Sequence, residues 1–203
     1  MKTSRIVSSI LLLFFVITGF SQTSKEYYDR GIANYNNQDF KGAIADFTNV
    51  IQINPNDAAA FHWRRIVKCT LNEYSESIVD FNMAIEIDPK DFAAYYLRGI
   101  AKNNLKDYNR AILDFNNSIK LDSTNSEVYF ERGHAKYYLR NYIEAIDDYT
   151  ITIEIGTKIA PSYYGRGLLR ILLSQKESGC LDLSKAAELG YQKANEAIKQ
   201  YCQ

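Results

Sequence analysis

The chain has 203 residues, of which 46% are hydrophobic and 24% are charged, so its composition is that of a folded protein and not of a disordered one. Its 24 basic residues balance its 24 acidic residues. This balance argues against a basic surface that would bind nucleic acid through its phosphates.

The first 21 residues are typical of a secretory signal peptide. Lys2 and Arg5 precede an unbroken apolar run over residues 10–17, and small residues prepare a cut between Ser21 and Gln22. The alternative is an uncleaved signal anchor, but the apolar stretch is shorter than the roughly 20 residues that span a bilayer. We therefore expect an exported mature chain without a stable membrane span, located in the periplasm, on the cell envelope or outside the cell.

From residue 24 onwards, one short pattern returns every 34 residues. Its arginines are Arg30, Arg64, Arg98, Arg132 and Arg166. Each repeat reads as two amphipathic helices of about 14 residues joined by a tight turn. The expected repeats cover residues 24–57, 58–91, 92–125, 126–159 and 160–190, followed by a capping helix over 191–203. A strict period of this length predicts an all-α solenoid of helical hairpins.

Other positions recur with the same period. A glycine column is broken only by Arg65, and an aromatic column contains Phe47 and its equivalents. The glycines let the two helices of a hairpin approach, and the aromatic rings fill the space between hairpins. The first two repeats end in proline, after which Asp57 and Asp91 are expected to cap the next helix.

On these residues the chain resembles the tetratricopeptide repeat family over residues 24 to about 190. The aromatic residue that opens each repeat, the glycine, the small residue and the later aromatic carry the resemblance. It implies a right-handed superhelical solenoid of five hairpins, in which the first helix of each hairpin lines a concave, peptide-binding groove. The ending, with Cys180-Leu181-Asp182 and a final Tyr201-Cys202, is similar to exported bacterial members of the family and has a Sel1-like flavour.

An aspartate column accompanies the arginines, at Asp46, Asp80, Asp114, Asp148 and Asp182. Arginine and aspartate lie at equal distances from the hairpin turn, so we predict a repeated ion pair between facing helices. The alternative is a row of ligand-binding charges. Exposed pairs contribute only about 0–1 kcal/mol each, so their expected role is to fix the register of the two helices.

Two cysteines near the end have positions that suit a disulfide. Cys180 and Cys202 lie at similar distances on either side of the turn at Gly190, and export would permit oxidation. The alternative is that both are small buried apolar residues. Cys69 falls on an inner helix and has no role that the sequence predicts.

The predicted partner-binding surface follows the inner helices. Residues four, seven and eight positions apart share one helix face, and aromatic and amide side chains suit an adaptable peptide site. The predicted groove residues are Tyr28, His62, Tyr96, Asn103, Asn104, Phe130, His134, Tyr137, Tyr138 and Tyr164.

No pattern for chemistry accompanies this surface. The two histidines lack the spacing of a metal site, and no phosphate-binding loop or nucleophile motif is present. We expect no cofactor and no metal. The sequence predicts a scaffold that binds a protein or peptide and no nucleic acid. Two alternatives remain: a structural subunit of an envelope complex that uses its convex face or ends, and an enzyme of a type not recognised from sequence.

Overall fold

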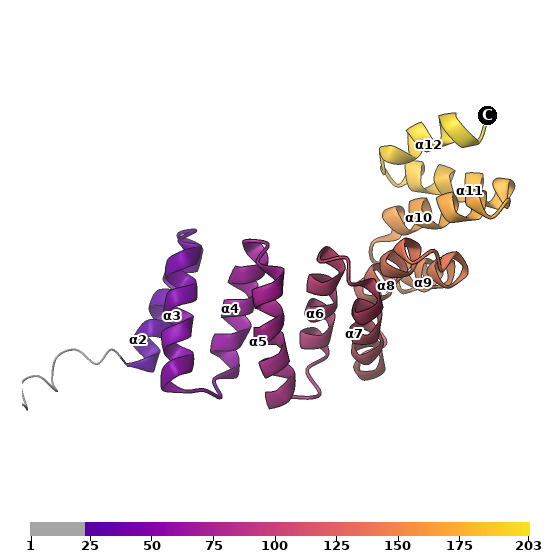
Figure 1. The fold of residues 1–203 in the computed structure, drawn as a ribbon. Helices are drawn as coiled ribbons and strands as arrows, with labels where there is room; N and C mark the ends of the chain where they lie inside the picture. The colour runs from indigo at the N-terminus through magenta and orange to yellow at the C-terminus, as the bar shows by residue number, and fades with distance from the viewer. Residues whose placement is uncertain (1–22) are drawn as a thin grey trace, which may run out of the picture. The chain divides into compact units, whose positions relative to one another are not determined.

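The computed structural model describes residues 23–203, so the expected signal peptide lies outside the described part. Within residues 23–203 the structure contains only helices and no strand, and successive helices form antiparallel pairs (Figure 1). The all-α fold predicted from the sequence is therefore confirmed. None of the helices in this range is both long enough and apolar enough to cross a membrane. The chain divides into two compact units, residues 1–67 and 68–203, which we describe separately.

The described part of the N-terminal unit contains α2 (Ser24–Asn36), α3 (Phe40–Ile53) and most of α4 (Ala58–Thr70). Its core consists of Ala43, Phe47 and Val67, which are fully buried. Trp63 covers this core and stacks on Phe47, with the two ring centroids 6.3 Å apart.

The C-terminal unit contains the remaining hairpins. Its helices are α5 (Tyr74–Ile87), α6 (Phe92–Asn104), α7 (Tyr108–Leu121), α8 (Ser126–Tyr138), α9 (Tyr142–Ile155), α10 (Ile159–Leu172), α11 (Lys176–Glu188) and α12 (Lys193–Tyr201). Neighbouring hairpins pack through successive helices, and α6 contacts α8, the first helix of the next hairpin. The last helix, α12, packs against α11 and α10. We call the side formed by α6, α8 and α10 the inner face, and α5, α7, α9 and α11 the outer helices.

Helix ends follow the chemistry expected from the sequence. The side chains of Asp57 and Asp91 accept hydrogen bonds from the backbone N–H groups of Ala60 and Ala94, each at 3.0 Å. These contacts satisfy donors that the first turn of a helix leaves without partners. The fourth repeat ends differently, because Gly156 adopts a left-handed conformation with φ of 103° and terminates α9.

The glycine and aromatic columns meet inside each hairpin. A methyl group on Gly99 would lie only 2.5 Å from the ring of Phe115, and one on Gly31 would lie 2.8 Å from the ring of Phe47. The aromatic ring of the second helix therefore occupies the space that a side chain on the first helix would need. In the second repeat Arg65 replaces the glycine, and it is buried with Nη2 2.7 Å from Nδ1 of His62.

The predicted arginine–aspartate pairs are present in four hairpins. Arg30, Arg98, Arg132 and Arg166 pair with Asp46, Asp114, Asp148 and Asp182 respectively. However, we expected these pairs to be exposed, and that expectation is wrong for the carboxylates. All four aspartates are buried, with exposed fractions of 5% or less. They point into the space between the two helices of a hairpin, where solvent does not reach.

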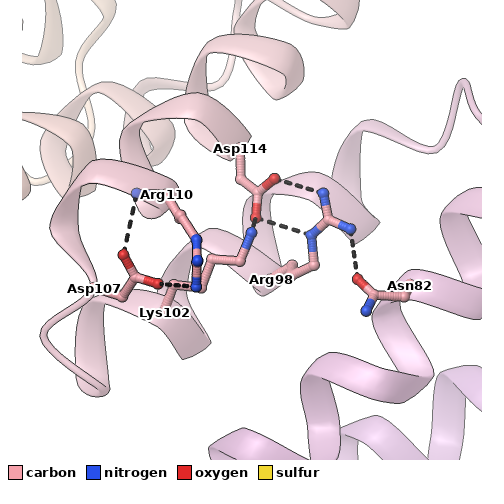
Figure 2. A network of polar contacts seen from close by, with 6 residues as sticks. All are labelled: Asn82, Arg98, Lys102, Asp107, Arg110 and Asp114. Atoms are coloured by element: carbon pink, nitrogen blue, oxygen red, sulfur yellow. Dashed lines mark hydrogen bonds and ion pairs between the residues drawn. The ribbon is translucent and has the colours of Figure 1, made fainter.

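Each pair belongs to a larger network, which Figure 2 shows for the third repeat. Arg98 donates to both oxygens of Asp114, at 2.6 and 2.9 Å, and to Oδ1 of Asn82 in the preceding repeat at 2.7 Å. Lys102, one turn after Arg98, donates to the same carboxylate at 2.7 Å. The arginine thus connects the helices of its own hairpin and also joins that hairpin to the one before it.

The chain ends in a covalently tethered cap. Cys180 on α11 and Cys202, immediately after α12, form a disulfide, with their Cα atoms 5.7 Å apart. Cys69 is a thiol. The bond fixes the end of α12 to the last hairpin, and this placement is central to the candidate site.

Candidate functional site

A cavity of about 570 Å³ opens on the inner face near the end of the C-terminal unit. Helix α8 contributes Phe130, His134 and Tyr137 to its lining. Helix α10 contributes Pro161, Tyr164, Gly165, Leu168, Leu169, Ile171 and Leu172. The sequence places these side chains together because residues three or four positions apart on α8 and on α10 point to the same side of each helix.

The terminal cap supplies the third wall of the cavity. Tyr191 precedes α12, Lys193 begins it and Tyr201 ends it, and all three line the cavity. The ring of Tyr191 lies 5.0 Å from that of Tyr164 on α10, within the usual range for paired aromatic rings. Because Cys202 follows Tyr201 directly, the disulfide fixes the position of this wall.

Gly165 helps to explain why the cavity lies in the last repeat. The equivalent positions of the other repeats carry Asp29, Trp63, Leu97 and Glu131. A methyl group on Gly165 would lie 2.9 Å from Cε2 and 3.1 Å from Cζ of Tyr149, the carbon that bears the hydroxyl. The missing side chain therefore leaves the edge of the Tyr149 ring open to the cavity, whose lining includes both residues.

The cavity is mainly aromatic, and its polar groups are only weakly engaged by the protein. Tyr149 is 3% exposed, and burial, with a smaller contribution from the charge of Glu131, raises the pKa of its hydroxyl. Burial also raises the pKa of Tyr164 and lowers the pKa of His134. All three groups are therefore favoured in their neutral forms. In the part of the chain that the structure describes, the hydroxyls of the cavity tyrosines form no hydrogen bond with another residue.

The structure brings four of the predicted groove residues together around this cavity: Phe130, His134, Tyr137 and Tyr164. Their aromatic rings are in contact, since those of Phe130 and His134 stack with centroids 6.2 Å apart. Tyr138, next to Tyr137, is not part of the lining. Its ring stacks on that of Tyr108 at 4.8 Å, on the rim beyond His134.

Three further predicted residues lie on α6, away from the cavity. Tyr96 packs against the core around Phe115 and donates to Oε2 of Glu127 at 3.3 Å. Asn103 donates to the backbone carbonyl of Glu131 at 3.2 Å, while its own Oδ1 is buried without a partner. Asn104 is exposed and donates to the carbonyl of Ile100 in its own helix. Asn103 is thus the α6 amide with an unused acceptor.

The remaining two predicted residues, Tyr28 and His62, belong to the N-terminal unit. Tyr28 packs edge-on against Phe47, with ring centroids 5.8 Å apart, and forms part of the cover of the core. His62 is exposed and contacts Arg65.

Sequence reasoning missed Gly165 and the cap residues Tyr191, Lys193 and Tyr201. The cap was treated only as a closure for the apolar end of the array. One signal was available, because a disulfide between Cys180 and Cys202 would bring Tyr201 close to the last hairpin. No signal in the repeat pattern distinguished Gly165, which lies outside the recurrent glycine column.

The described residues contain no group of three or more histidine, cysteine, aspartate or glutamate side chains that could hold a metal ion. The chemistry of the cavity is instead that of recognition, through aromatic surface, neutral hydroxyls and one ammonium group.

Comparison with known proteins agrees with this architecture. Residues 24–57 and residues 81–112 match sequence profiles of the tetratricopeptide repeat. A search of curated protein sequences gives no significant match.

Several solved structures share the fold. A crystal structure of MamA superposes with a TM-score of 0.79 at 21% identity, covering 90% of this chain and 97% of that one. MamA from Desulfovibrio magneticus RS-1 gives 0.77 at 15% identity, covering 82% and 94%. YrrB, described as a TPR protein with an unusual peptide-binding site, gives 0.75 at 17% identity, covering 87% and 92%. Together with the profile matches, these similarities show that the chain contains tetratricopeptide repeats and has the all-α solenoid fold of a protein-interaction scaffold.

Proposed function

We propose that this protein is an exported scaffold that binds a peptide or a partner helix on the inner face of its C-terminal unit, with the aromatic cavity as the anchoring point. The cavity carries this proposal. Its volume of about 570 Å³ lies within the roughly 300–1,000 Å³ typical of ligand pockets. Buried aromatic pockets of this kind commonly hold the few side chains that dominate the affinity of a protein interface.

The exposure of the lining also supports binding. Tyr137, Leu172 and Tyr201 are 42%, 57% and 38% exposed, although each contributes apolar surface to the same cavity. Covering these side chains with a partner would remove apolar area from water at about 25 cal/mol per Å². Tyrosine is well suited to this task, because it offers a rigid apolar ring and a hydroxyl that can pair with a peptide group.

Export is the second part of the proposal. The basic start, the apolar run over residues 10–17 and the small residues before Gln22 favour a cleaved signal peptide. A disulfide between Cys180 and Cys202 is compatible with this, since such bonds persist mainly in oxidising compartments. The protein would then act in the periplasm, on the envelope or outside the cell.

The site can be tested with a variant that removes the exposed part of the lining. Tyr137, Leu172 and Tyr201 are changed to serine together, and the variant and the wild type are compared for binding to peptides selected from a random display library. We expect selected peptides to lose at least tenfold in affinity while helicity is retained. Peptides that bind the variant and the wild type equally would place the site elsewhere.

One observation favours a second candidate function, in which a partner docks on the outer helices. Val79, Leu113 and Leu181 recur with the 34-residue period on α5, α7 and α11, and they are 58%, 62% and 73% exposed. Regularly spaced apolar side chains on an otherwise solvated face suit a structural subunit of an envelope complex. Changing these three residues to serine is the matched control for the cavity variant, and a loss of binding in this control alone would favour the second function.

A further inference from the structure

The cavity has features that select among peptides, and they extend the proposed function on which this inference rests. We infer that it accepts a bulky aromatic or aliphatic side chain of a partner peptide, and that the neighbouring residue of that peptide is an aspartate or glutamate whose carboxylate pairs with Lys193.

The depth of the cavity argues for a bulky anchor. Gly165 leaves room that a side chain occupies at the same position of every other repeat. The walls around it are the rings of Phe130, Tyr164 and Tyr191. An aromatic or branched aliphatic side chain would meet several ring faces and edges here, and such contacts add to the gain from burial alone.

The deepest polar group of the lining points to the chemistry of the anchor. Tyr149 is almost completely buried, and its hydroxyl has no hydrogen-bond partner among the residues that the structure describes. A buried hydroxyl without a partner carries an energetic cost. A ligand group that accepts or donates a hydrogen bond at this point would remove that cost.

Charge defines the neighbouring position. Lys193 is the only residue of the lining that carries a formal charge when His134 is neutral. It forms no ion pair with any residue in 23–203, whereas Lys136, Arg166 and Arg170 on the inner helices each pair with a buried aspartate. The nearby Glu196 contributes to the raised pKa of Tyr164 but does not line the cavity. The charge that the cavity presents to a ligand is thus positive, and its complement is a carboxylate.

The test begins with a library of random peptides displayed on phage and selected on the wild-type protein. The best peptide is then synthesised as a C-terminal amide, so that only side-chain carboxylates are present. Two analogues accompany it: in one the acidic residue is replaced by lysine, and in the other the bulky anchor is replaced by alanine. Affinities are measured by fluorescence polarisation on the wild type and on the variants Lys193→Glu, Lys199→Glu, Tyr149→Phe and Gly165→Leu.

We expect selected peptides to place phenylalanine, tryptophan, tyrosine or leucine beside aspartate or glutamate. Lys193→Glu should weaken the acidic peptide by about three- to tenfold and strengthen the lysine analogue, as expected for a partly exposed charge pair. Lys199→Glu is the matched control, since Lys199 is exposed on the same helix outside the cavity, and it should change affinity by less than about twofold. Tyr149→Phe should weaken binding by about two- to tenfold through the lost hydrogen bond.

The possible failures can be told apart. Selected peptides that are basic, or that respond equally to Lys193→Glu and Lys199→Glu, would overturn the assignment of the acidic neighbour while leaving a peptide site in the cavity. Peptides that bind Gly165→Leu, Tyr149→Phe and the wild type alike would overturn the assignment of the anchor. If the wild type selects no peptide, the proposed function fails together with this inference.

Discussion

The buried aspartates are the residues on which the geometry of each hairpin depends. In the C-terminal unit Asp114, Asp148 and Asp182 each accept from two cations one helical turn apart. A carboxylate in such a position has little water to solvate it, so the two cations supply the compensation. The 34-residue period of arginine and aspartate predicted the pairing, but it could not predict the burial. Burial depends on how closely the facing helices approach, and this is set by the glycine beside the aromatic ring.

The first prediction concerns Asp114, which Figure 2 shows between Arg98 and Lys102. Asp114→Ala leaves both cations, which are 16% and 14% exposed, without their common counter-charge. We expect the free energy of unfolding, measured by urea denaturation, to fall by about 3–5 kcal/mol, as for other broken buried ion pairs.

The control for Asp114→Ala is the surface pair in the same figure. Arg110 lies 3.2 Å from Asp107, and its side chain is 75% exposed. Arg110→Ala should therefore change the free energy of unfolding by less than about 1 kcal/mol. Similar small effects for both variants would show that Asp114 is better hydrated than the structure indicates.

At the scale of elements, the turns within the hairpins share an unusual backbone conformation. Gln38, Asn72, Lys106, Arg140 and Ser174 all have positive φ values between 60° and 65°. They are spaced by the same 34 residues, and each lies between the two helices of its repeat. The left-handed region is unfavourable for residues with a Cβ, and asparagine and glycine tolerate it best. The sequence predicted a tight turn here, but only Asn72 carried a residue type that indicates this conformation.

The second prediction follows from that conformation. Arg140 has φ of 64° and is exposed, so Arg140→Gly relieves backbone strain and removes little packing. We expect a net gain in the free energy of unfolding of about 0.5–1 kcal/mol, because the greater freedom of glycine in the unfolded chain offsets part of the relief. Arg140→Ala keeps the Cβ and should be close to neutral. A loss of stability in the glycine variant would contradict this explanation.

The third prediction concerns the cap, an element that is both structural and part of the site. The disulfide closes a loop with a sequence separation of 22 residues, and in the chain-entropy model its loss costs about 3 kcal/mol. Cys202→Ser should lower the melting temperature and weaken peptide binding, since Tyr201 and Lys193 are then held less firmly. Cys69→Ser leaves the bond intact and is the control. Unchanged peptide affinity in Cys202→Ser would show that the packing of α12 alone holds this wall.

At the scale of the whole molecule, the repeat pattern predicted most of the fold and only part of the site. Helices, turns and caps recur with the sequence because each hairpin buries the same few positions. The cavity does not recur. It depends on the missing side chain of Gly165 and on a cap whose residues Tyr191 and Tyr201 approach α10 only after folding. A departure from a repeat is visible in the sequence, but whether it opens a site depends on what packs beside it.

The last prediction joins export to the cap. In a bacterial host that exports the full-length chain, we expect the mature protein to begin at Gln22, because the small residues before it suit cleavage. Its non-reduced peptide map should contain the joined Cys180 and Cys202 peptides, since the bond forms in an oxidising compartment. Intact mass and peptide mapping measure both results.

Two variants make this prediction specific. A chain lacking residues 1–21 stays in the reducing cytoplasm, and there both thiols should be open to alkylation. Leu12→Arg interrupts the apolar run and should block export, leaving an uncleaved and reduced chain. A full-length wild-type chain retained in the membrane would instead favour a signal anchor, and an exported protein with two alkylatable thiols would separate export from the disulfide. If both expectations hold, the binding cavity receives its final wall only after the protein has left the cytoplasm, because that wall is tethered by the bond between Cys180 and Cys202.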